Sequence, residues 1–164
     1  MPQSAQLSLY LSNPRVSLKD KLHKICRAVK SDVSACDRVS IWLFNDDYSE
    51  MTSLICIDEN GQKSAGEKLF SKDYGDYFSH IINHQILVAS DAREHAISKC
   101  FNLGYFDVHN IYSLLDVTFT KDNDTPLGII CCERTGNIAK WKTDEIEILK
   151  NISTKASLFI SNSY

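Results

Sequence analysis

The fold is decided by the stretch Asp37-Arg38-Val39-Ser40-Ile41-Trp42-Leu43-Phe44. This stretch is rich in β-branched and aromatic residues, which favour a strand. The residues Asn45, Asp46 and Asp47 that follow it are typical of a turn and end the strand. Because the strand is apolar on both faces, we expect it to be a central strand that is covered on both sides.

The neighbouring segments predict the rest of a sheet. Residues 50–57 form a returning strand, and Asn60-Gly61 forms the next tight turn. A second pair of strands, 112–120 and 127–134, is predicted around the turn at 121–126. Successive hairpins indicate an antiparallel sheet.

Helices are predicted at both ends of this sheet. Apolar residues recur at three-and-four spacing over residues 16–34, with Ser17 and Asp20 as a capping pair at the start. The last helix begins at about residue 143, with Thr143 as its N-cap, and shows no stop signal before Tyr164.

Shorter elements are expected between the two hairpins. A short segment at 68–70 precedes a helix at 77–84 and a strand at 86–89. A further helix is predicted at 94–101, followed by a loop at 102–111.

This order of elements predicts an α+β domain with helices packed on a mostly antiparallel sheet. The chain has 164 residues, which suits one domain. We assign residues 16–164 to that domain and residues 1–15 to a loose N-terminal extension.

The composition excludes several classes. The net charge is −3 and no basic run exceeds two residues, so no nucleic-acid partner is expected. The six cysteines are scattered without C-x-x-C spacing, which favours a reducing cytoplasm. No signal peptide and no apolar run long enough to span a membrane is visible, so we expect a cytoplasmic domain with no membrane insertion.

Five segments in order resemble the GAF domain family. They are Asp37-Arg38-Val39-Ser40-Ile41-Trp42-Leu43, Val88-Ala89-Ser90-Asp91-Ala92-Arg93, Tyr112-Ser113-Leu114-Leu115-Asp116-Val117, Leu127-Gly128-Ile129-Ile130-Cys131-Cys132-Glu133 and Trp141-Lys142-Thr143-Asp144-Glu145. The resemblance implies a central antiparallel sheet with the N- and C-terminal helices on one face. It also implies short helices and loops that enclose a pocket on the other face.

The resemblance further implies a sensory or dimerising module of a bacterial signalling protein, of the diguanylate cyclase or histidine kinase type. A linked output domain would then be controlled by the state of this domain. A PAS-type sensor shares the function class but is normally shorter and lacks long helices at both ends.

No catalytic activity is expected from the motifs. The sequence contains no G-x-S-x-G motif, no P-loop and no paired Cys and His. Free methionine sulfoxide reductases share the fold, but their characteristic glycine- and cysteine-containing loops are not recognisable here.

A ligand pocket is inferred on one side of the sheet. Strand side chains alternate, and the resemblance to bilin-binding relatives places Trp42 on the pocket side. The alternative is that the same side chains fill a core with no ligand. The candidate pocket residues are Trp42, Phe44, Tyr77, Asp91, Phe101, Ser113, Leu115, Cys131 and Glu133. No cofactor or ligand is identified.

Two acidic residues each have two interpretations. Glu133 ends an apolar strand, so it either binds a donor group of a ligand or pairs with Arg38, Arg93 or Arg134. Asp91 follows a short strand, where it either contacts a ligand or closes a turn.

Three further motifs have a functional and a structural interpretation. Cys100 lies where the bilin-linking cysteine falls in phytochrome-type domains, although the usual His after it is missing; the alternative is a half-buried thiol. His80 and His84 are spaced to face one metal, or to sit at a helix end. The third motif comprises Asn137, Lys140, Trp141, Asp144 and Glu145. It loosely resembles the signature of cyclic-nucleotide-binding GAF domains. The alternative is that it contains only a surface ion pair between Lys140 and Asp144.

The last helix suggests a homodimer through the terminal helices. Its apolar residues lie on more than one side, which exceeds what one sheet face needs. The helix could therefore pair with its twin, with or without a ligand in the pocket. These residues are Ile146, Ile148, Leu149, Ile152, Ala156 and Phe159.

Overall fold

A computed structural model describes residues 2–122 and 124–164. Its centre is an antiparallel sheet in the order β3-β2-β1-β7-β6-β5, with β4 also paired to β2. The strands are β1 (Arg38–Phe44), β2 (Glu50–Ile57), β3 (Lys63–Ser64), β4 (Lys68–Phe70), β5 (Ile86–Ala89), β6 (Ile111–Lys121) and β7 (Thr125–Thr135). The predicted central strand is confirmed, because β1 lies between β2 and β7.

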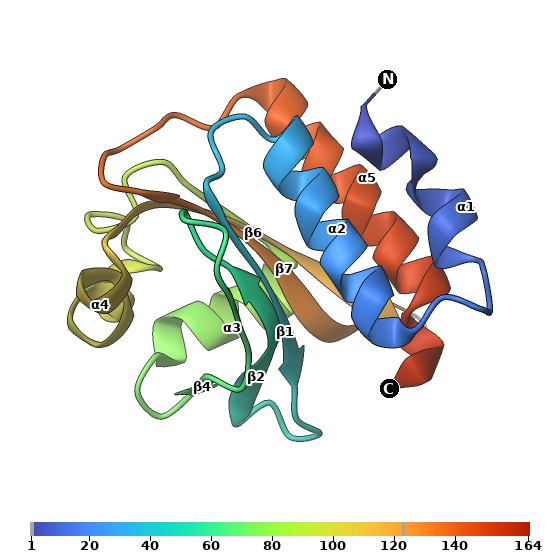
Figure 1. Ribbon diagram of the computed structural model, residues 1–164. Coiled ribbons are helices and arrows are strands. Elements are labelled where there is room, and N and C mark those ends of the chain that lie inside the picture. Colours follow the sequence, from blue (N-terminus) through green and yellow to red (C-terminus); the bar gives the residue numbers. More distant parts are fainter. Residues whose placement is uncertain (1, 123) are drawn as a thin grey trace.

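The helices form one layer on each side of the sheet. Figure 1 shows α1, α2 and α5 on one face and α3 and α4 with their loops on the other. We call the second face of the sheet the inner face. The helices are α1 (Leu7–Leu11), α2 (Leu18–Asp32), α3 (Gly75–His84), α4 (Asp107–His109) and α5 (Thr143–Phe159). The predicted α+β architecture is confirmed.

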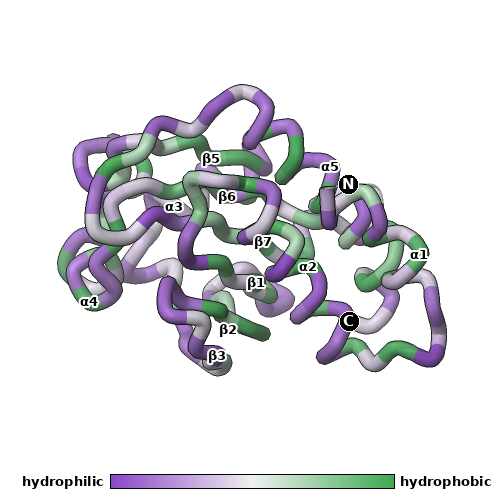
Figure 2. Tube along the Cα trace, turned by 45° about the horizontal axis from the view of Figure 1, so that its top comes forward, coloured by the Kyte–Doolittle hydropathy of each residue, from purple (hydrophilic) through white to green (hydrophobic). Residues whose placement is uncertain are grey.

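Alternation along the strands produces two separate apolar cores. In β1, Val39 and Ile41 pack among the buried residues of α2 and α5, whereas Trp42 and Phe44 pack on the inner face. Hydrophobic residues recur along the strands and along α1, while most connecting loops are hydrophilic (Figure 2). Burial of both faces accounts for the nearly continuous apolar sequence of the central strands.

The helix ends are fixed by side-chain caps. Ser17 Oγ accepts a hydrogen bond from the Asp20 amide at 3.1 Å, as the sequence predicts for α2. The predicted cap of α5 is wrong, because Lys142 and not Thr143 is its N-cap. The reason is Glu145, whose carboxylate turns back to accept from the amides of Lys142 at 2.9 Å and Ala35 at 2.8 Å.

The N-terminal segment is part of the core and not a loose extension. Residues Gln3–Gln6 form a 3₁₀ turn and lead into α1. Leu7 and Leu11 are fully buried among the residues of α2 and α5. The Asp32 carboxylate also accepts from the amides of Gln3 and Ser4, so the segment is tied to the end of α2.

The segment between β5 and β6 also differs from expectation. The predicted helix at 94–101 is replaced by turns and a short 3₁₀ helix, Lys99–Phe101. The predicted loop at 102–111 contains a π-helical turn, Asn102–Phe106, followed by α4. Ser98 Oγ donates to the Ala92 carbonyl at 2.7 Å, which holds the chain in a tight turn instead of a regular helix.

No helix in the described part of the chain is long and apolar enough to cross a membrane. The structure leaves the prediction of a cytoplasmic location untested.

A substitution at Gly128 tests the close approach of β7 to β1. A Cβ added there would overlap the Trp42 carbonyl oxygen and the Phe119 ring. We expect Gly128→Ala to lower the free energy of unfolding by about 2 kcal/mol or more in urea denaturation. Gly75→Ala is the control, because nothing lies within 4 Å of its added Cβ. Equal stabilities of the two variants would contradict this packing.

Candidate functional site

Aromatic side chains gather on the inner face. Trp42 comes from β1, Tyr77 from α3, and Phe101, Tyr105 and Phe106 from the segment 99–109, which we call the cover segment. The ring centroids of Trp42 and Tyr105 lie 6.1 Å apart, and those of Tyr77 and Phe101 lie 4.8 Å apart. Such spacings are those of edge-to-face aromatic packing.

A small cavity remains between these rings and the sheet. Its volume is about 10 Å³, which is about the space that one water-sized group needs. The lining residues are Trp42, Met51, Leu69, Tyr77, Phe101, Tyr105, Phe106, Leu114, Asp116 and Cys131. A larger ligand therefore requires the cover segment to move.

Asp116 supplies the carboxyl group in the wall of this cavity. The Tyr77 hydroxyl donates to its Oδ2, whereas Oδ1 has no hydrogen-bond partner among the described residues. Burial raises the pKa of Asp116 to about 7, although the neighbouring Cys131 thiol and Tyr77 hydroxyl lower it. Asp116 is thus poised to change its protonation state near neutral pH.

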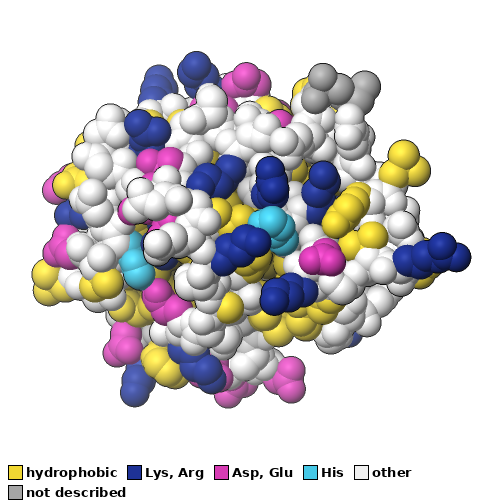
Figure 3. All heavy atoms as spheres, viewed as in Figure 1, with side chains coloured by type: hydrophobic (Ala, Val, Ile, Leu, Met, Phe, Trp, Pro, Cys, Tyr) yellow, Lys and Arg dark blue, Asp and Glu magenta, His cyan; other side chains and the backbone are white. Residues whose placement is uncertain are grey.

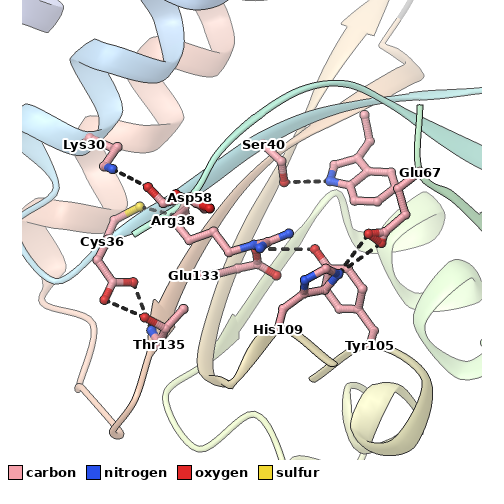
Figure 4. A network of polar contacts seen from close by, with 12 residues as sticks. Lys30, Cys36, Arg38, Ser40, Asp58, Glu67, Tyr105, His109, Glu133 and Thr135 are labelled. Atoms are coloured by element: carbon pink, nitrogen blue, oxygen red, sulfur yellow. Dashed lines mark hydrogen bonds and ion pairs between the residues drawn. The ribbon is translucent and has the colours of Figure 1, made fainter. Parts of the chain in front are cut away.

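A second buried acid, Glu133, is paired. Arg38 Nε donates to Glu133 Oε1 at 3.1 Å, and the Tyr105 hydroxyl donates to the same oxygen at 3.4 Å (Figure 4). Oε2 has no partner among the described residues. Burial raises the pKa of Glu133, although the Arg38 guanidinium lowers it. The predicted structural pairing with Arg38 is confirmed, and neither Arg93 nor Arg134 takes this role.

The cover segment is held at its edges by an ion pair and by a contact between a histidine and a carboxylate. Arg93 Nη1 lies 2.6 Å from Asp107 Oδ1, and His109 Nε2 lies 2.9 Å from Glu67 Oε1. Figure 4 shows His109 and Glu67 beside Tyr105. These pairs are partly exposed, so each contributes little to stability. The segment is therefore fixed chiefly by its buried aromatic rings.

Four of the predicted pocket residues come together at the cavity, namely Trp42, Tyr77, Phe101 and Cys131. Glu133 lies beside them, through its contact with Tyr105. These positions agree with the predicted side of the sheet. Whether they bind a ligand remains a prediction.

Two predicted residues lie elsewhere in the fold. Leu115 packs in the core between the sheet and the helices α2 and α5, so its assignment to the inner face is wrong. Ser113 Oγ donates to the Ser90 carbonyl at 2.7 Å and accepts from the Ala139 amide at 2.9 Å, so it ties two loops together. The physical reason is a register shift between Ile111 and Ser113, after which Leu114 and Asp116 face inward.

The other two predicted residues are also outside the cavity wall. Phe44 belongs to the inner-face core but lines a surface hollow near the turn after β1. Asp91 is exposed, and its carbonyl accepts from the amides of Glu94 and His95. The backbone of Asp91 therefore takes part in a turn, and a turn closed by its side chain stays a prediction.

Sequence reasoning missed Asp116 and the cover-segment residues Tyr105 and Phe106. A signal for Asp116 was available, because an acid inside an apolar strand is more informative than its apolar neighbours. Asp116 is also the cross-strand partner of Cys131, which was predicted, and such partners share a face. The two aromatic residues gave no signal, because their segment has no strand or α-helical period.

The remaining motifs have structural environments. Cys100 is half-buried, does not line the cavity, and donates weakly to the Ile97 carbonyl at 3.5 Å. The rings of His80 and His84 lie 4.5 Å apart, but no cluster of three metal-ligating side chains occurs in the described part of the chain. Trp141 Nε1 donates to the Leu114 carbonyl at 3.0 Å, so this aromatic is part of the core.

A basic groove lies on the opposite side, between α2 and β3. Figure 3 shows Lys and Arg side chains gathered around a histidine on this face. The groove has a volume of about 490 Å³, and its cationic side chains are Arg27, Lys30 and Lys63. His23 also lines it, but burial and the neighbouring Lys63 and Arg27 lower the pKa of this imidazole. These residues are scattered in the sequence, so the absence of basic runs did not exclude a basic patch. The expectation of no nucleic-acid partner remains a prediction.

The fold and this enclosed inner face define the protein as a small α+β domain with an aromatic core on one side of its sheet. A family model for the GAF domain matches residues 17–160. The chain therefore belongs to the GAF domain family, a family of sensory domains.

Several solved structures show the same fold. The phycoerythrobilin-bound GAF domain of a cyanobacterial phytochrome is similar with a TM-score of 0.77 and 16% identity, over 98% of this chain and 93% of that chain. The GAF domain of the Acinetobacter phosphoenolpyruvate-protein phosphotransferase has a TM-score of 0.74 and 15% identity, over 98% and 92% of the two chains. A methyl-accepting chemotaxis protein has a TM-score of 0.73 and 13% identity, over 98% and 95%. No curated protein sequence matches the chain significantly.

For the Arg38–Glu133 pair, we expect the loss of one partner to destabilise the fold more than the loss of both. Arg38→Met leaves a buried carboxylate without its cation, and we expect it to lower the free energy of unfolding by about 3–5 kcal/mol. The double variant Arg38→Met/Glu133→Leu removes both charges and should recover most of this loss. Denaturation of the wild type and the two variants measures the difference. A double variant as unstable as the single one would contradict the pairing.

Asp116 predicts a pH dependence of stability. Its folded pKa of about 7 lies above the usual value, so the folded state binds the proton more tightly than the unfolded state. The contribution of Asp116 to the free energy of unfolding is therefore fully present below its unfolded pKa of about 4, and it is lost as the pH rises through about 7.

We therefore expect Asp116→Asn to be more stable than the wild type by a few kcal/mol at about pH 8, with a smaller difference at about pH 5. Urea denaturation at both pH values measures this. Asp73→Asn, at an exposed position, is the control and should show no such change. A pH-independent effect of Asp116→Asn would argue against the raised pKa.

Proposed function

We propose that this chain is a regulatory, non-catalytic domain that binds a small molecule at the inner face. Its occupancy would control a linked output domain, such as one that synthesises cyclic di-GMP or a histidine kinase. The observation that carries the proposal is the presence of two buried acids, Asp116 and Glu133, each with one oxygen that no described residue donates to. Leaving a buried polar atom unpaired costs about 1–3 kcal/mol, so such atoms commonly serve a function.

Strand β6 connects the cavity to α5, so it could carry a ligand-induced shift from the inner face to that helix. It supplies Asp116 and Leu114 to the cavity wall. The same strand bonds to α5, because Ser153 Oγ donates to the Thr118 carbonyl and Ser157 Oγ accepts from the Thr120 amide. A ligand that shifts β6 would therefore bias the position of α5, which is a population shift.

The cover segment is the place where we expect a ligand to enter the cavity. It contributes three aromatic rings to the inner face, and weak polar contacts hold its edges. It contains a π-helical turn, a feature that is frequent at functional sites. Displacement of this segment would open the cavity to a molecule larger than one water-sized group.

A ligand-free dimerisation module is the second candidate. Leu9 of α1 is 84% exposed and Leu158 of α5 is 66% exposed, on helices that pack against each other. Exposed apolar residues on these terminal helices are typical of a surface that binds another protein chain. A homodimer through these helices is compatible with ligand binding.

A bilin photosensor is the less favoured alternative. Phycoerythrobilin is bound by one of the similar GAF domains. In this chain the cavity holds only about 10 Å³ and Cys100 is not in its wall. We also propose a cytoplasmic location, since all six cysteines are free thiols.

Ligand binding is tested by titrating the labelled protein with a panel of amino acids, nucleotides, amines, oxyanions and tetrapyrroles. We expect at least one class to shift the amide resonances of β6, β7 and the cover segment in NMR spectra, and to raise the melting temperature. Leu114→Ala should alter this response, whereas the exposed Ile138→Ala should leave it unchanged. A panel without any inner-face shift would refute the ligand-binding proposal.

Dimerisation is tested by light scattering over a wide concentration range. We expect a dimer for the wild type and a monomer for Leu9→Glu/Leu158→Glu, because each charge would be buried in the interface. Val108→Glu, at an exposed site on α4, is the matched control and should remain dimeric. A monomeric wild type at the highest concentration would contradict the dimer.

A further inference from the structure

The two inner-face acids differ in how their charge is balanced. Glu133 has the guanidinium of Arg38 at 3.1 Å. Asp116 is only 3% exposed, and it takes part in no ion pair formed by the described residues. Within the part of the chain that the structure describes, its Oδ1 also has no hydrogen-bond donor. The inner face therefore contains one carboxyl group without either a cation or a full set of donors.

The space beside Asp116 is aromatic and small. The cavity wall contains the rings of Trp42, Tyr77 and Phe101 in addition to the carboxyl group, and Tyr105 and Phe106 complete it. Aromatic π-systems attract cations, most strongly where water is excluded. The volume of about 10 Å³ accommodates one water-sized group, which is the size of an ammonium head group.

We propose that the ligand of the inner face carries a primary ammonium group, which donates to Asp116 Oδ1 and packs among the aromatic rings. This inference rests on the proposed ligand-binding function and specifies its chemical class. A carboxylate or phosphate group is disfavoured, because it is larger than the cavity and would face the buried carboxyl group of Asp116. The carbon part of the ligand extends toward the cover segment, which must yield to admit it.

The groups around Asp116 make its protonation the step that responds to the ligand. It faces Tyr77 from α3, Tyr105 from the cover segment, and Cys131 and Glu133 from β7, with Arg38 of β1 behind Glu133. Burial raises the pKa of each of Tyr77, Tyr105 and Cys131, so these three side chains stay neutral at neutral pH. An ammonium group stabilises the ionised form of Asp116. Binding therefore releases a proton from the protein when the pH is below about 7.

The test compares three probes of nearly equal size that differ in charge, namely butylammonium, butan-1-ol and butyrate. Titration of the whole chain, followed by NMR and calorimetry, gives the affinity of each. We expect butylammonium to shift the resonances of β6, β7 and the cover segment and to bind at least ten-fold more tightly than butan-1-ol. Butyrate should leave the inner face unchanged.

Two further measurements assign the binding to Asp116. Asp116→Asn should weaken butylammonium binding at least ten-fold, whereas Asp73→Asn, at an exposed position, should not. In the wild type, binding should be roughly ten-fold weaker at about pH 6 than at about pH 8, because the ligand must displace a proton from a group with a pKa of about 7. The pH comparison needs no variant and remains decisive if Asp116→Asn fails to fold.

The outcomes separate this inference from the proposed function. Inner-face binding of butan-1-ol or butyrate as tight as that of butylammonium overturns the ammonium assignment and leaves ligand binding supported. Butylammonium binding that is independent of pH and of Asp116 also overturns the assignment. If none of the three probes shifts the inner face, the ammonium assignment fails, and the wider panel decides whether another class of ligand binds.

Discussion

The pairing of β6 with β7 is the interaction on which the rest of the structure depends. Its register sets Asp116 opposite Cys131 and Leu114 opposite Glu133, and it directs all four side chains to the inner face. The same register sends Leu115 and Val117 to the core under α2 and α5. A slip by one residue would exchange these sets and bury the acids against the helices. One strand pair therefore defines both the apolar support and the polar site.

The sequence predicts this pair as a hairpin but not the faces of all its residues. Alternating and apolar patterns identify β1, β2, β6 and β7, and the resemblance to the GAF family places Trp42 and Cys131 on the correct face. The shift between Ile111 and Ser113 reverses the alternation beyond it, and no local pattern reports a bulge of this kind. Ser113 and Leu115 were assigned to the wrong face, and Asp116 was overlooked although an acid within an apolar strand marked it.

The cover segment and the N-terminus were missed for another reason. Both consist of short turns of helix whose stability comes from tertiary burial and not from periodicity. Phe101, Tyr105 and Phe106 are buried although their segment has no regular period. Leu7 and Leu11 are likewise fully buried on α1, a helix of five residues that is too short to be recognised from its spacing. Such segments are determined by the surface that they cover.

The different fates of Glu133 and Asp116 follow from what lies on the neighbouring strand. At the β1 side of β7, Arg38 is registered with Glu133, so its guanidinium reaches that carboxylate within the sheet. Asp116 lies on β6, whose other neighbour β5 presents Leu87 at the paired position and offers no cation. Across the cavity, the Tyr77 hydroxyl from α3 donates to its Oδ2. An acid in this position has one remaining direction for a charged partner, which is the cavity itself. Its protonation is therefore linked to whatever occupies that cavity, and through β6 to the position of α5.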